Sequence, residues 1–221
     1  MKKAILFSLF FGSLACADTV QMSFVSANPI EIVPGTPGYE AGPYTMKVNG
    51  QLVPAMCMDD FRGVNGTWTA WVTPVGSSDL SHTVLGSNQT RTDDGYSVTG
   101  VQLYEMEAYI FSEIVQPNAD RKHLQLAAWA LMDPSTMSNV IKDKNTFVQN
   151  DIAGAYDAIH NRNSGFNPGA YEILSDIGGK NQEFIVATPE PSMFFLMGTG
   201  LVLAGAIRFS RRRKKATESQ S

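Results

Sequence analysis

The first half of the chain contains the stretch Val53-Pro54-Ala55-Met56-Cys57-Met58-Asp59-Asp60. The chain has two cysteines, and the other one, Cys16, lies in a segment that we expect to be removed during secretion. A thiol that remains alone cannot form an internal disulfide. Cys57 is therefore a buried small apolar side chain, half of an intermolecular bridge, or a group with reactive chemistry.

The N-terminus has the pattern of a secretion signal. Two lysines precede an apolar run over residues 4–14, and small residues stand before the bond that follows Ala17, as a signal peptidase requires. We therefore predict a signal peptide over residues 1–17. A lipoprotein anchor on Cys16 is the alternative, but it would require a large aliphatic residue at the position that Ser13 occupies.

The C-terminus combines an apolar run with a basic cluster. The run covers residues 193–207 and would be about 22 Å long as a helix, which only just crosses the hydrocarbon core of a bilayer. Residues 211–215 are all Arg or Lys and should stay in the cytoplasm. We predict an exported domain over residues 18–188, a tail with a transmembrane helix over 189–215, and a polar cytoplasmic end over 216–221.

The tail begins with Pro189-Glu190-Pro191. This motif, followed by a short apolar helix and a basic cluster, resembles the PEP-CTERM sorting tail of bacterial surface proteins. The resemblance implies that an exosortase-type enzyme processes the tail at these residues. The protein would be anchored in the membrane only transiently, before it reaches the cell surface or the extracellular matrix. Without processing, the same segment would be a plain single-pass anchor.

The predicted exported domain is acidic, with nine Lys or Arg against nineteen Asp or Glu between Asp18 and Thr188. This balance argues against nucleic acid and anionic lipid head groups as partners. Solubility of a secreted domain explains the charge without any partner. One cysteine and three scattered histidines do not supply the ligands of a zinc or haem site, so we predict no metal and no cofactor.

The periodicity of apolar residues predicts a mixed fold. Two-residue alternation predicts strands over residues 20–25, 44–48, 51–58, 67–75, 171–174 and 183–187, with one short hairpin within 79–99. A helical period predicts helices over residues 101–115, 121–132 and 146–160. This order suits an α+β domain, an antiparallel β-sandwich or barrel-like sheet with an inserted helical subdomain, in addition to the C-terminal transmembrane helix.

Local signals refine the strands. Asn49-Gly50 predicts a tight hairpin turn, because both residues accept the positive φ that such a turn needs. Cys57 then lies near the end of the return strand, where Pro54 indicates an edge strand or a bulge.

Other signals mark a buried face and the ends of a helix. In the first strand, Met22 and Phe24 should share a face that is turned to the core. Asn118 or Asp120 can cap the second helix, and Asp133-Pro134 should stop it.

The second predicted helix contains Leu124-Gln125-Leu126-Ala127-Ala128-Trp129. Together with Met56-Cys57-Met58-Asp59-Asp60-Phe61 on the strand, this segment resembles the thioester domains of bacterial surface adhesins. Residues 104–110 and 182–186 also resemble parts of the PEP-CTERM relatives of this domain, so the resemblance spans most of residues 44–188. It implies an internal thioester between the Cys57 sulfur and the Gln125 side-chain carbon.

Such a bond has strict physical requirements. A thiolate is a good nucleophile but an amide is a poor electrophile, so the fold must hold the two groups together and exclude water. Trp129 lies one helical turn after Gln125 and can shelter it. We expect Met56 and Met58 to shield the site as well. Asp59 and Asp60, which follow, can accept hydrogen bonds near the cysteine, but a solvated turn is their expected role.

These features predict an exported bacterial surface or matrix protein. It would be an adhesin that bonds covalently through Gln125 to an amine- or hydroxyl-bearing ligand, and it would not be an enzyme, because the thioester is consumed once. Two alternatives keep a free thiol, namely a non-reactive structural matrix or coat protein and a cysteine-dependent hydrolase. The hydrolase needs a thiolate activated by an imidazolium or a helix N-terminus. Surface positions are the expected place of the three histidines, His82, His123 and His160.

Overall fold

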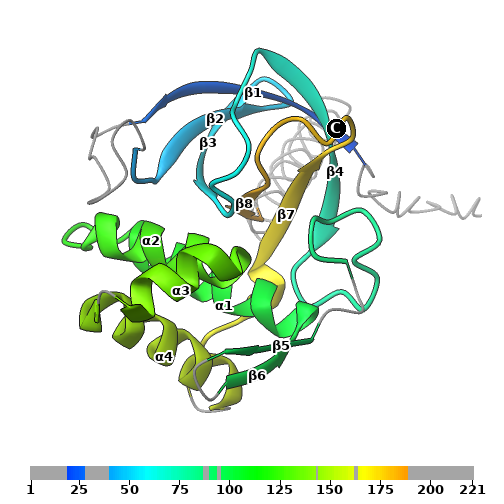
Figure 1. Ribbon diagram of the computed structural model, residues 1–221. Coiled ribbons are helices and arrows are strands. Elements are labelled where there is room, and N and C mark those ends of the chain that lie inside the picture. The colour runs from blue at the N-terminus through cyan, green and yellow to red at the C-terminus, as the bar shows by residue number, and fades with distance from the viewer. Residues whose placement is uncertain are drawn as a thin grey trace, which may run out of the picture.

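A computed structural model describes residues 19–27, 40–86, 90–93, 96–142, 144–161 and 164–188. Six strands form a closed barrel in the order β1-β2-β3-β8-β7-β4, and all neighbouring pairs are antiparallel. The barrel strands are β1 (Thr19–Ala27), β2 (Tyr44–Val48), β3 (Gln51–Cys57), β4 (Thr67–Pro74), β7 (Tyr171–Asp176) and β8 (Phe184–Ala187). They form the upper part of the molecule in Figure 1.

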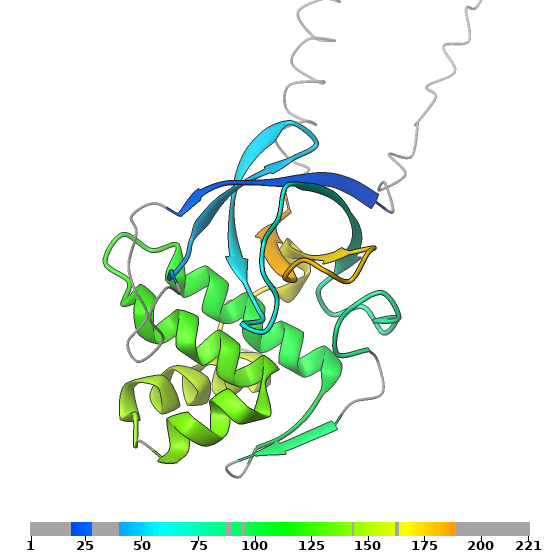
Figure 2. The same ribbon diagram turned by 45° about the horizontal axis from the view of Figure 1, so that its top comes forward.

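A helical subdomain is inserted between β4 and β7, after a separate hairpin of β5 (Thr90–Asp93) and β6 (Tyr96–Thr99). Its helices are α1 (Gly100–Ile114), α2 (Arg121–Met132), α3 (Pro134–Lys142) and α4 (Thr146–His160). They gather on one side of the barrel in both views (Figure 1, Figure 2). The fold is therefore α+β as predicted, and its main sheet is closed into a barrel.

The predicted signal peptide and sorting tail lie outside the described residues, and so do Ala17, Pro189, Glu190 and Pro191. The predicted transmembrane helix over residues 193–207 also falls there. Within the part of the chain that the structure describes, no helix combines the length and the apolar character that a membrane crossing requires.

The strands β2 and β3 form the predicted tight hairpin. Asn49 and Gly50 have φ values of 48° and 86°, in the left-handed region that this turn requires. β3 pairs with β2 on one side and with β8 on the other, so the edge strand predicted from Pro54 is wrong. The ladder to β8 begins only at Ala55, one residue after the proline, where a backbone N–H is available again.

The strand β1 departs from its predicted pattern. Met22 is buried, but Phe24 is 39% exposed, and Ala27 is buried further along the strand. The pairing of β1 with β2 shifts its register between Phe24 and Ser26. Such an irregularity breaks the two-residue alternation, and the pattern of the strand alone does not reveal it.

The helix α2 begins and ends where the sequence predicts. The Asp120 side chain caps it by accepting a hydrogen bond from the His123 backbone N–H. The helix α3 is absent from the prediction, because Pro134 is interpreted there only as a stop signal. Proline also suits the first turn of a helix, and here Asp133 accepts a hydrogen bond of 2.9 Å from the Ser135 N–H at the start of α3.

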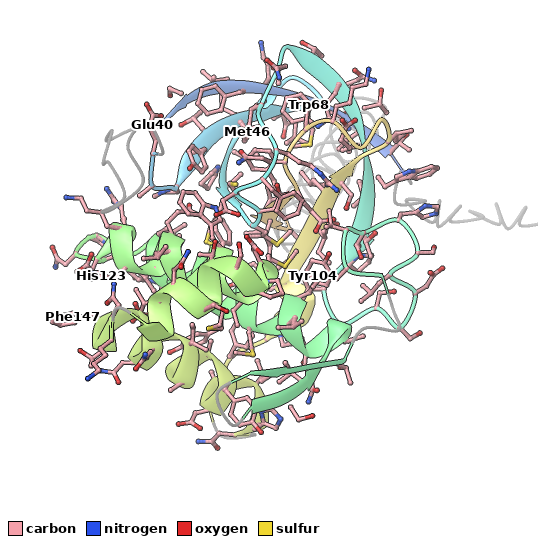
Figure 3. The ribbon with its side chains drawn as sticks, viewed as in Figure 1. Glu40, Met46, Trp68, Tyr104, His123 and Phe147 are labelled. Atoms are coloured by element: carbon pink, nitrogen blue, oxygen red, sulfur yellow. The ribbon has the colours of Figure 1, made fainter. Side chains whose placement is uncertain are left out.

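Two clusters of buried side chains meet at β3. Met56 and Met58 belong to a large cluster formed mainly by the helices. Cys57 belongs to a second cluster, which fills the barrel and includes Met46 and Trp68 (Figure 3). Because side chains alternate along a strand, Cys57 faces the barrel interior while its two neighbours face the helices.

Candidate functional site

Cys57 is the last residue of β3 and is fully buried. Its backbone pairs with Phe184 of β8, and its side chain shares the barrel cluster with Tyr44, Phe184 and Trp129. The thiol donates a hydrogen bond of 2.8 Å to the backbone oxygen of Asp59. Burial, followed by the nearby charge of Asp59, raises the pKa of Cys57 well above its usual value, so the neutral thiol is the stable form.

Gln125 lies on α2, is fully buried and contacts the backbone of Cys57. Its side-chain nitrogen Nε2 donates a hydrogen bond of 2.7 Å to the Cys57 carbonyl oxygen, across 68 residues of chain. Its oxygen Oε1 accepts a hydrogen bond of 3.1 Å from the Gly42 N–H. The amide is therefore held at both ends, with its plane fixed beside the last residue of β3.

Trp129 lies on α2 one turn after Gln125, and only 1% of it is exposed. Although Trp129 lies on a helix, its side chain belongs to the barrel cluster that contains Cys57. A side-chain hydrogen bond from Trp129 partly opposes the rise in the pKa of Cys57. The indole thus lies beside the thiol, and its sheltering role stays a prediction. Met56 and Met58 are also fully buried, but they lie on the side of β3 that faces the helices.

Asp59 does not lie in a solvated turn, and that prediction is wrong. Its side chain is buried, and Oδ2 accepts a hydrogen bond of 2.8 Å from the Glu183 N–H. Its backbone oxygen accepts the Cys57 thiol and, at 2.8 Å, the Gln182 side chain. Burial raises the pKa of Asp59 to about 6. Asp60 is partly exposed and accepts a hydrogen bond of 3.0 Å from the Thr136 hydroxyl.

Two buried carboxyl groups near this region are missing from the sequence prediction. Glu183 stands just before β8 and accepts hydrogen bonds from the Ser175 hydroxyl, the Tyr104 hydroxyl and the Val84 N–H. Burial raises the pKa of Glu183 to about 7. Glu107 on α1 is buried as well, and its charge acts on Cys57. Its spacing from Tyr104 places it on the buried face of α1, which the helical period could have revealed.

The three histidines pack elsewhere. The His123 ring stacks on Phe147 with centroids 5.1 Å apart, and it contacts Asp120 at 2.8 Å. Figure 3 shows this pair on the helical subdomain, away from the barrel. His82 stacks on Trp71, and His160 stacks on a tyrosine of its own helix. His82 and His160 are exposed as predicted, whereas His123 is partly buried.

No group of three or more His, Cys, Asp or Glu side chains within the described ranges is arranged to hold a metal ion. Besides burial, the groups that shift the pKa of Cys57 are Asp59, Trp129 and Glu107. The site is therefore fully buried, and in it the side-chain amide of Gln125 contacts the backbone of Cys57, with the buried carboxyl groups of Asp59 and Glu107 near enough to act on the thiol.

The chain has similarities to two solved structures and to one sorting motif. No curated protein matches the chain. The structure is similar to the N-terminal thioester domain of the fibronectin-binding protein SfbI from Streptococcus pyogenes, with 10% identity, a TM-score of 0.45, and coverage of 78% of this chain and 94% of that one. It is also similar to the N-terminal domain of the Streptococcus pyogenes pilus tip adhesin Cpa, with 13% identity, a TM-score of 0.42, and coverage of 77% and 93%.

The sorting tail predicted from Pro189-Glu190-Pro191 is confirmed. Residues 187–214 match the PEP-CTERM protein-sorting motif, so this chain carries that motif at its C-terminus.

Proposed function

We infer that Cys57 and Gln125 form an internal thioester, and that the protein is an exported surface adhesin that uses this bond to attach covalently to a partner. One observation carries the proposal. The Gln125 amide is fully buried and is held between the Cys57 carbonyl at 2.7 Å and the Gly42 N–H at 3.1 Å, beside the chain's only described cysteine.

The bond would form by attack of the Cys57 sulfur on the Gln125 side-chain carbon. The C–N bond of the amide breaks, the thiol proton passes to the departing nitrogen, and ammonia leaves. Negative charge develops on Oε1 during the attack, and the Gly42 N–H that already contacts this oxygen would stabilise it. The hydrogen bond to the Cys57 carbonyl fixes the amide, which reduces the entropy cost of reaching the reactive geometry.

The burial of the pair favours the bonded state over the free thiolate. A thiolate is charged, and burial raises the pKa of Cys57 well above its usual value. A thioester is neutral and escapes this desolvation cost. The same dry surroundings keep water from hydrolysing the bond, so the acyl group would persist until a stronger nucleophile reaches it.

Export follows from the sorting motif at residues 187–214 together with the signal-like N-terminus. Signal peptidase would cut after Ala17, and an exosortase-type enzyme would process the tail at Pro189, Glu190 and Pro191. The domain over residues 18–188 would then reach the cell surface or the extracellular matrix. An amine or hydroxyl of the partner attacks the Gln125 carbon once and frees Cys57, so the reaction does not turn over.

The intact mass of the purified full chain tests the bond. We expect a mass that is lower than the sequence mass by one ammonia, and both Cys57→Ala and Gln125→Ala should abolish this deficit. Gln116→Ala, which changes an exposed glutamine outside the site, is the matched control and should keep it. A full sequence mass in fresh wild-type protein, with a thiol that is alkylated once the chain is unfolded, would contradict the proposed thioester.

A non-reactive matrix or coat protein is the second candidate, because complete burial also suits a cysteine that only fills the core. It predicts the full sequence mass in the same experiment. A cysteine-dependent hydrolase fits poorly, since the pKa of Cys57 is raised and the described histidines pack on aromatic rings elsewhere.

A further inference from the structure

The buried carboxyl group of Asp59 is only partly satisfied by hydrogen bonds. The side chain is fully buried, and Oδ2 accepts the Glu183 N–H at 2.8 Å. Its other oxygen, Oδ1, is also buried and has no hydrogen-bond partner of normal geometry among the described residues. Burying a carboxylate oxygen in this way costs free energy, and such an exception to the usual pairing of buried polar groups calls for an explanation.

The same residue contacts the thiol of the candidate site. The Cys57 sulfur donates its hydrogen bond of 2.8 Å to the backbone oxygen of Asp59, two residues further along the chain. Two carboxyl charges act on Cys57, those of Asp59 and Glu107, and that of Asp59 has the larger effect. Because the energy between two charges falls with their separation, Asp59 is the carboxyl group best placed to exchange a proton with the sulfur.

The other candidate bases fit less well. Glu183 already accepts three hydrogen bonds, and it is not among the groups that shift the pKa of Cys57. The three histidines stack on aromatic rings away from the thiol. Glu107 acts on Cys57 more weakly than Asp59 does.

The sulfur has to lose its proton when it attacks the amide. Burial makes a free thiolate unfavourable, so a base has to take the proton during the attack rather than before it. We propose that the Asp59 carboxylate accepts the Cys57 proton as the thioester forms, and that it makes this step depend on pH. The proposal rests on the thioester of the proposed function and adds the residue that promotes its formation.

The proton passes through Asp59 without being consumed. The Cys57 sulfur bonds to the Gln125 side-chain carbon while its proton moves to the carboxylate of Asp59. The negative charge collects on Oε1, where the Gly42 N–H already donates a hydrogen bond. The carbon–nitrogen bond then breaks, Asp59 returns the proton to Nε2, and ammonia leaves. Asp59 ends as the carboxylate with which it began.

This role fixes the direction of the pH dependence. Burial raises the pKa of Asp59 to about 6, although the Glu183 N–H and the charge of Arg62 act in the opposite direction. Above that pH the carboxylate is free to accept a proton, and below it Asp59 already holds one. The rate of ammonia loss should therefore rise with pH and level off above about 6. The titratable and charged groups that interact with Asp59 or Cys57 are Tyr44 on β2, Asp60 and Arg62 after β3, Glu107 on α1, and Glu183 before β8.

A pH jump on the full chain tests the proposal. Chains purified unfolded, with the full sequence mass, are refolded below about pH 5, where Asp59 is protonated, and tryptophan fluorescence confirms that they have folded. They are then transferred to a series of higher pH values, and intact mass follows the loss of ammonia. We expect a midpoint near pH 6 in the wild type. Asp59→Asn keeps an acceptor for the Glu183 N–H, yet it should slow the plateau rate about a hundredfold and abolish the midpoint.

Two variants serve as controls for the loss of a neighbouring carboxyl group. Asp60→Asn changes the next residue, whose side chain accepts a hydrogen bond from Thr136, and should alter neither the plateau rate nor the midpoint. Glu183→Gln should also keep the midpoint near pH 6. If the rise in rate disappears in Glu183→Gln and persists in Asp59→Asn, Glu183 is the base and the proposal is overturned.

The outcomes separate the base from the bond. If Asp59→Asn loses ammonia as fast as the wild type and with the same midpoint, Asp59 has no role, and the thioester stands. Should Asp59→Asn fail to fold, NMR titration of the Asp59 carboxyl group in the unreactive Gln125→Ala chain takes its place. The titration midpoint has to coincide with the kinetic midpoint of the wild type, and a mismatch overturns the proposal. If folded wild-type protein loses no ammonia at any pH, the thioester itself fails and the role of Asp59 fails with it.

Discussion

The Tyr104 hydroxyl of α1 donates a hydrogen bond of 2.6 Å to Glu183 Oε2, just before β8. The other oxygen of this carboxyl group accepts the Ser175 hydroxyl of β7 and the Val84 N–H at 3.0 Å. One buried side chain therefore ties the helical subdomain, the barrel and the loop that follows β4. The protonation of Glu183 should affect how firmly these parts hold together.

Stability should fall as the pH rises through neutrality. Burial raises the pKa of Glu183 to about 7 from a usual 4.5, so the folded protein holds this proton more tightly than the unfolded chain. The stabilisation is then fully present below pH 4.5 and is lost between pH 4.5 and 7, by about 3 kcal/mol at most. Urea unfolding at pH 5 and pH 8 measures this difference. Glu183→Gln should reduce this difference, with the remainder due to Asp59, whose pKa is also raised by burial, whereas Asp157→Asn on the exposed side of α4 should leave it unchanged. An equal or steeper fall in Glu183→Gln would contradict the assignment.

Gly42→Ala should slow formation of the thioester. A Cβ at residue 42 would lie 3.2 Å from Gln125 Oε1, closer than ordinary van der Waals contact, and would push the amide from its place. We expect the rate of ammonia loss after refolding to drop about tenfold or more. Gly154→Ala is the control, because a Cβ there meets open space. Unchanged kinetics of the mass deficit in Gly42→Ala would show that the Gly42 contact does not position the amide.

Trp129→Ala should expose the bond to water. The indole is 1% exposed and packs in the barrel cluster with Cys57, so its removal should cost about 3–5 kcal/mol of stability and admit solvent. We expect hydrolysis to leave Glu at position 125, detectable by peptide mass. Trp71→Ala removes a tryptophan that stacks on His82 and should leave the deficit intact. A thioester in Trp129→Ala that lasts as long as in the wild type would mean that other side chains keep the site dry.

Surface material should contain chains that lack residues 193–207. The sorting motif at 187–214 motivates this expectation. Mass spectrometry of the C-terminal peptides from washed cells and from the medium would identify the last residue. Replacing Pro189, Glu190 and Pro191 together by alanine should leave the chain in the membrane fraction. If the wild type is recovered only with its apolar run, the tail is a permanent anchor.

Most of the elements could be predicted because their signals are local. Asn49 and Gly50 fix a hairpin by their own backbone preferences, and Asp120 caps α2 through its own side chain. The α3 helix was missed since the same proline can stop one helix and start the next. The burial of Ala27 was missed because the register shift that follows Phe24 depends on the partner strand.

In the candidate site, too, the residues with local sequence signals could be predicted and the others could not. Cys57 and Gln125 stand in recognisable segments, so the sequence could single them out. Gly42 contributes only a backbone N–H, and no residue pattern predicts that contact. Asp59 and Glu183 carry residue types that are usually exposed, and their burial depends on hydrogen bonds across more than 100 residues of chain, such as the one of 2.8 Å between them.

The position of β8 determines how the domain would resist a pulling force applied between Gln125 and its C-terminal end. The chain leaves the barrel at Ala187 toward the sorting tail, while Phe184 at the other end of the strand pairs with Cys57 beside Gln125. If a partner bonded at Gln125, as proposed, were pulled away from the chain beyond Ala187, the force would therefore act along β8. Its hydrogen bonds to β3 and β7 lie across that direction, so they would resist in shear, all together, rather than open one after another.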